Sequence, residues 1–146
     1  MARITNLTGA LTANVYMLLI IAVFAARILG WLEIGRWVGF ASSLIIVPLV
    51  YLFVVGLRTG RRKIYFVWLA LMVLFALFEL VVDQILRIDL RTAQWTVVPY
   101  VMFFFAATGG MIGVASQAGK TWAITTVIIF LIMVTLAFVQ RGITGL

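Results

Sequence analysis

Glu79 and Asp83 are the residues of this chain best placed to do chemistry, because both lie within one long apolar segment, residues 64–86. About 20 apolar residues are enough for a helix to cross a bilayer, and this segment is longer. A charge in the bilayer centre costs roughly 2.5–3.5 kcal/mol on insertion scales, so the two carboxylates need partners inside the protein. We therefore expect the other helices to be arranged around this pair.

The partners of the two carboxylates can be predicted from helical spacing and depth. Glu79 and Asp83 are four residues apart and so share a helix face, and Arg87, four residues further on, is expected to pair with Asp83. Glu79 lies roughly 10 Å from the end of its span, and Arg27 lies roughly 7–8 Å from the same end of the first span. This match predicts that Glu79 points into the bundle and pairs with Arg27, with Ser43 at a similar depth.

Two interpretations of this predicted polar cluster compete. In the structural interpretation, the ion pairs only fix how the spans pack. In the functional interpretation, two neighbouring carboxylates share a proton or hold a cation, with serine hydroxyls as further ligands. The arginines nearby favour the structural interpretation, because they already neutralise the acids.

Other kinds of catalytic or metal site find little support in the composition. The chain has no Cys and no His, which removes thiolate ligands and the commonest general base and zinc ligand. The six Met residues are scattered and form no Met-x-x-Met pair, so packing explains them better than copper binding. We predict no catalytic residue, no metal site and no cofactor.

The composition indicates the elements that must position the cluster. The chain is 66% hydrophobic and 10% charged, whereas a soluble domain is roughly 45–50% apolar and about 25% charged. We predict an all-α integral membrane protein, a single domain over residues 1–146 forming a compact bundle of five transmembrane helices with short loops. The predicted spans cover residues 11–32, 35–57, 64–86, 96–116 and 122–140.

Small residues and one proline predict how these spans pack. Glycines on the second and fourth spans are expected to face other helices, because small residues let helix backbones approach closely in lipid. These glycines are Gly35, Gly39, Gly109, Gly110 and Gly113. Pro48 should kink the second span, since its ring clashes one turn back and it lacks an N–H.

The basic residues predict orientation and exclude one class of partner. The net charge of +7 comes from short clusters between apolar runs, of which residues 58–63 form the densest, so it indicates lipid headgroups and not nucleic acid. The positive-inside rule then predicts that the chain lies in a bacterial-type cytoplasmic membrane with its amino terminus on the cytoplasmic side.

Three classes of function are compatible with these features. The first is a non-catalytic accessory, assembly or self-associating membrane module, whose partners are the lipid bilayer and other membrane subunits or further copies of itself. The alternative is a small ion- or proton-coupled transporter or channel that uses Glu79 and Asp83 in the outer half of the bundle. A membrane enzyme is the least supported, because only these carboxylates and hydroxyl groups are left for acid–base work.

Overall fold

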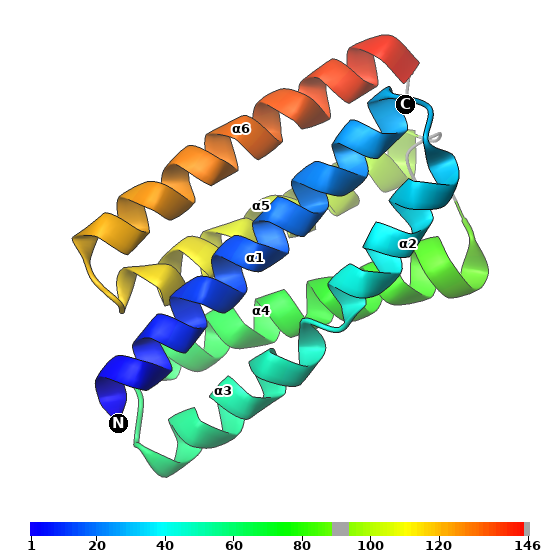
Figure 1. Ribbon diagram of the computed structural model, residues 1–146. Helices are drawn as coiled ribbons and strands as arrows, with labels where there is room; N and C mark the ends of the chain where they lie inside the picture. The colour runs from blue at the N-terminus through cyan, green and yellow to red at the C-terminus, as the bar shows by residue number, and fades with distance from the viewer. Residues whose placement is uncertain (89–93, 145–146) are drawn as a thin grey trace.

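The computed structural model describes residues 1–88 and 94–144 and is helical throughout its regular elements (Figure 1). In chain order the helices are α1 (Ala2–Ile28), α2 (Leu32–Ser43), α3 (Ile46–Arg58), α4 (Lys63–Glu79), the π-helix η1 (Leu80–Leu86), α5 (Gln94–Ser116) and α6 (Lys120–Thr144). Two pairs, α2 with α3 and α4 with η1, are continuous enough to act as single spans. Five segments are therefore long and apolar enough to cross a membrane, which confirms the predicted all-α bundle.

The helix at the centre of the bundle is α1, which contacts α2, α3, α5 and α6 (Figure 1). Small residues on one side of α1 let its neighbours close in. Ala10 and Ala13 are fully buried, and a Cβ atom added at Gly9 would stand 2.9 Å from a methyl group of Val114. Sequence reasoning placed the acidic span at the centre, but small residues in the first span decide the packing.

Three helix boundaries differ from the predicted ones. The first helix begins at Ala2 and not near residue 11. Its first turns are polar and lower the local hydropathy, so the apolar run from which the span was predicted starts later than the helix does. It ends at Ile28, and Gly30 adopts a positive φ of 74° in the turn that follows. The second span was predicted to begin at residue 35, whereas α2 starts at Leu32.

The second span is interrupted at Leu44 and Ile45, one turn before Pro48. Because Pro48 has no N–H, the carbonyl of Leu44 cannot accept the usual bond from four residues ahead. It accepts one from the N–H of Val47 instead, at 3.1 Å. The predicted proline kink therefore lies between α2 and α3, and it turns the second span away from a straight course (Figure 1).

Polar side chains tie α1 to the rest of the bundle at two depths. At the amino-terminal end, the Asn6 side chain donates to the Gln117 carbonyl at 2.8 Å and accepts a bond from Arg61. Deeper in the bundle, the side-chain oxygen of Asn14, Oδ1, accepts a 3.0 Å hydrogen bond from the hydroxyl of buried Thr126 in α6. Because buried polar groups are costly when unpaired, these bonds specify the positions of the helices around α1.

Two of the three glycines of the fourth span lie at a tight helix contact. A Cβ atom added at Gly110 would stand 2.9 Å from the backbone oxygen of Trp68 in α4, and one at Gly113 would overlap the Trp68 ring. Gly109 differs from the prediction: it is exposed, and a Cβ there would meet nothing within 4 Å in the described chain. The Trp68 side chain fills the side of α5 where Gly110 and Gly113 lie, and Gly109 faces outward.

Candidate functional site

A cavity of about 370 Å³ lies at the end of the bundle opposite the amino terminus, where α1, α2, η1 and α6 meet. In the described part of the chain, five charged residues line its walls: Arg27, Arg36, Glu79, Asp83 and Arg87. Ser42, Gln84 and Gln140 add uncharged polar groups. The remaining wall is apolar. The acidic residues singled out from the sequence therefore do face a common space, together with polar residues that the sequence reasoning did not include.

The π-helix η1 decides where Asp83 points. Its wider i→i+5 turn changes the direction of every side chain after Glu79 relative to a regular α-helix. It ends at Leu86. The next residue, Arg87, has a left-handed backbone with a φ of 52°, and the N–H of Ile88 donates to the carbonyl of Val82 at 3.1 Å. The prediction that Asp83 pairs with Arg87 assumed an unbroken α-helix. The span is not unbroken, because the π-helix η1 follows α4.

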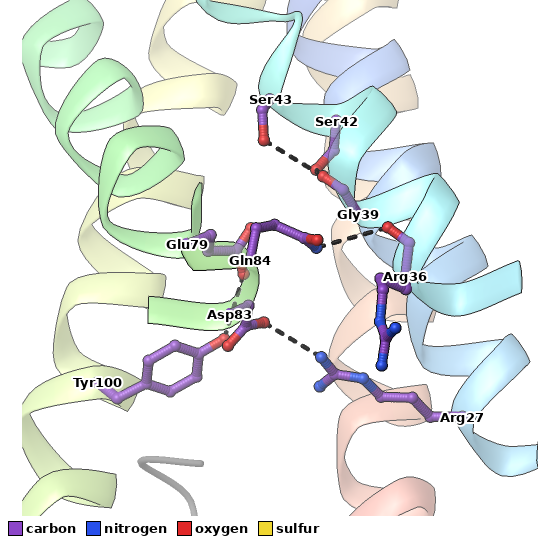
Figure 2. A network of polar contacts seen from close by, with 9 residues as sticks. All are labelled: Arg27, Arg36, Gly39, Ser42, Ser43, Glu79, Asp83, Gln84 and Tyr100. Carbon is purple, nitrogen blue, oxygen red and sulfur yellow. Dashed lines mark hydrogen bonds and ion pairs between the residues drawn. The ribbon is translucent and has the colours of Figure 1, made fainter. Parts of the chain in front are cut away.

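Arg27 pairs with Asp83, and not with Glu79 as predicted. Its Nη2 atom donates to the Asp83 Oδ2 atom at 3.1 Å, and both side chains are about a quarter exposed, at 25% and 28% (Figure 2). Among the described residues, it is the only ion pair within 4 Å. Depth matching found the correct helices. The acid that binds Arg27 is Asp83, within the π-helix, and not Glu79, at the end of α4.

Glu79 is bonded by a residue that sequence reasoning missed. The Tyr100 hydroxyl donates to the Glu79 Oε1 atom at 3.3 Å (Figure 2). The rings of Phe75 and Phe78 in α4 each lie 6.2 Å from the Tyr100 ring and hold it in place. Tyr100 lies six residues inside α5, roughly 9 Å deep. The depth argument that selected Arg27 would therefore have selected Tyr100 as well.

Gly39 makes room for a side chain that crosses from η1 to α2. The Gln84 amide nitrogen reaches the carbonyl of Arg36 at a long 3.5 Å, and a Cβ atom at Gly39 would stand 2.8 Å from that nitrogen. Of the two serines, it is Ser42 that lines the cavity. Ser42 and Ser43 both donate to the Gly39 carbonyl, at 2.6 and 3.3 Å (Figure 2). Ser43 thus stabilises α2 locally and does not face the cavity.

The arrangement has more positive than negative groups. Among the described residues, three guanidinium groups and two carboxyl groups line the cavity, and both carboxyl groups already bind a residue of the chain. A cation would have to displace Arg27 or Tyr100 from them, whereas an anion would find guanidinium groups to bind. Comparisons with protein family models, curated proteins and solved structures find no match.

Proposed function

We propose that this chain is a non-catalytic membrane module that associates with other membrane subunits or with further copies of itself. The proposal is supported by the outward face of α5. Gly109 and Ala106 are both exposed there, one helical turn apart, and leave open space beside the helix. Small residues on a lipid-facing surface allow a second helix to approach closely, and packing is the main force that joins helices in lipid.

The polar cluster fits the same proposal. Asp83 is bound by Arg27 and Glu79 by Tyr100, so the bonds of these two acids join three spans. Such bonds fix the relative positions of the spans and require no substrate. A rigid bundle with a small-residue face is what an assembly module needs.

Cross-linking through α5 tests the association. Since the chain has no Cys, Gly109→Cys introduces a unique thiol on the proposed face. We expect oxidation in membranes to join two copies, or one copy and a partner subunit, into a discrete adduct on a denaturing gel. Ile128→Cys is the matched control, because Ile128 is 53% exposed on α6 at a similar depth. Equal cross-linking at both positions, or none at Gly109→Cys, contradicts the proposal.

The orientation proposed for the chain places the amino terminus on the cytoplasmic side of a bacterial-type cytoplasmic membrane. Its support is the cluster of basic residues at 58–63, which shares an end of the bundle with Asn6. Gly60→Cys puts a thiol in this loop. We expect no reaction with a membrane-impermeant maleimide in intact cells and full reaction after permeabilisation. Labelling of intact cells would reverse the orientation.

A second candidate function is favoured by one observation, the cavity itself. Glu79 and Asp83 both line it, as a small ion- or proton-coupled transporter or channel would require. In this candidate, protonation of a carboxyl group would release Arg27 or Tyr100 and change the contacts between spans. Flux of protons or cations into proteoliposomes, present in the wild type and lost in Glu79→Gln, is the result that would favour it.

A further inference from the structure

We propose that the cavity between α1, α2 and η1 binds an anionic phosphate group, supplied by a lipid headgroup or by a soluble phosphate. The proposal goes beyond the module function and does not depend on it. It starts from the charges on the cavity wall. Among the described residues of the wall, Arg27, Arg36 and Arg87 face Glu79 and Asp83, so these five side chains carry one net positive charge even when both acids are ionised.

The excess charge is concentrated on Arg36 and Arg87. Arg27 is bound to Asp83, while neither of the other two arginines has an ion pair within 4 Å among the described residues. The Arg36 side chain extends from α2 toward that of Arg27, so two guanidinium groups approach the same space from neighbouring helices (Figure 2). Guanidinium groups bind phosphate oxygens through paired N–H bonds, and two of them together repel unless an anion lies between them.

The backbone of α2 adds to this preference. Leu32, Gly35 and Arg36 of its first two turns line the cavity, and no side chain caps the free N–H groups of the helix start. A helix start carries a partial positive charge and free donors, which favours an anion nearby. The acid of that turn, Glu33, is exposed and does not line the cavity.

The shape of the cavity suits a headgroup with an acyl chain behind it. Ile20, Val23 and Phe24 of α1 form an apolar wall next to the arginines. Because α2 begins and η1 ends at this cavity, we expect it to lie at the depth of the headgroups and the first part of the acyl chains. Basic pockets between transmembrane helices bind anionic headgroups on the cytoplasmic side of membranes, and the same pairing of guanidinium groups with phosphate is available at this end of the bundle. A free inorganic ion would make no favourable contact with the apolar wall beside the charges, whereas an acyl chain would.

The backbone of Arg87 provides a sharp test. Its left-handed conformation is one that glycine adopts without strain, so Arg87→Gly removes the guanidinium group while relieving the backbone. Its melting temperature should therefore not fall. Arg36→Gln removes the second guanidinium group while keeping a polar side chain. Arg141→Gln is the matched control, because Arg141 follows Gln140 at the same end of the bundle but does not line the cavity.

Native mass spectrometry in detergent, with dioleoylphosphatidylglycerol as the probe, measures the affinity for the first bound lipid. Loss of a hydrogen bond to a charged group typically corresponds to about a tenfold or larger loss of affinity. We expect at least that loss in Arg36→Gln and in Arg87→Gly, and an unchanged affinity in Arg141→Gln. Dioleoylphosphatidylcholine should bind more weakly than phosphatidylglycerol in the wild type.

Competition with inorganic phosphate distinguishes the two sources of the anion. If millimolar phosphate displaces the first phosphatidylglycerol, a soluble phosphate is a ligand of the site; if it does not, the ligand is the lipid. Either result keeps the phosphate site. Equal phosphatidylglycerol affinity in the wild type, Arg36→Gln and Arg87→Gly overturns it, and so does an equal loss in Arg141→Gln.

Discussion

Gly110→Leu is expected to unfold the bundle or to separate α4 from α5. Even the first added carbon would stand 2.9 Å from the backbone oxygen of Trp68 and 3.3 Å from its Cα atom. Backbone atoms cannot rotate away as a side chain can, so the two helices must move apart. Overpacking of a well-packed core typically costs about 1–3 kcal/mol, and we expect roughly 3 kcal/mol or more here because the obstacle is backbone. The measurement is the free energy of unfolding in mixed detergent and dodecyl sulfate micelles.

The adjacent glycine gives a matched control. Gly109→Leu adds the same atoms one residue earlier on the same helix, where a Cβ atom meets nothing within 4 Å. Because leucine also favours helix over glycine, the purified monomer should be at least as stable as the wild type. If both variants lose stability equally, or if Gly110→Leu unfolds like the wild type, the contact between α4 and α5 is not as described.

Arg27→Met is expected to destabilise the bundle by removing the guanidinium group that binds Asp83. Removing one partner of a fully buried pair typically costs about 3–5 kcal/mol, and since these two side chains are a quarter exposed we expect roughly 2–3 kcal/mol. Asp83→Leu should cost a similar amount, because it leaves Arg27 unpaired. The double variant Arg27→Met/Asp83→Leu should recover much of the loss, and the same unfolding assay measures the coupling energy.

A second cycle provides the control for this pair. Glu79 binds Tyr100 and not Arg27, so Arg27→Met and Glu79→Gln should show a smaller coupling energy than Arg27→Met and Asp83→Leu. The reverse order would restore the pair predicted from depth alone. The Arg27→Met/Asp83→Leu variant also separates the two candidate functions. If it is stable and still forms the α5 adduct, the cluster is structural; if it is stable but loses ion flux, the cluster is a transport site.

Hydropathy and depth predicted much of this fold from the sequence, because both follow from the bilayer. The apolar runs predicted five spans, and Pro48 predicted the break in the second of them. Depth matching correctly placed Arg27 beside the acidic span, since a charge in lipid must meet another at its own level. These arguments use one coordinate, the distance along the membrane normal, and they succeeded where that coordinate was enough.

The rest depends on rotation about helix axes, which hydropathy does not report. Arg27 pairs with Asp83, which lies in the π-helix over residues 80–86, and hydropathy does not predict that π-helix. The outward direction of Gly109 depends on which side of α5 the Trp68 ring occupies. Tyr100 differs, because it carries no charge and the pairing of charges at matched depth does not point to it.

The hydrogen bond between Asn14 and Thr126 joins residues 112 positions apart, and so links the first span to the last. During synthesis, α1 enters the membrane long before α6 is made. Until then it holds an amide in the bilayer whose carbonyl oxygen lacks its later partner, because the other bond of Asn14 is to its own helix. Helices in lipid form first and associate afterwards. The Asn14 side chain of the first span therefore gains this bond only after all the other spans have been synthesised. The last helix, α6, completes the polar contacts of the first.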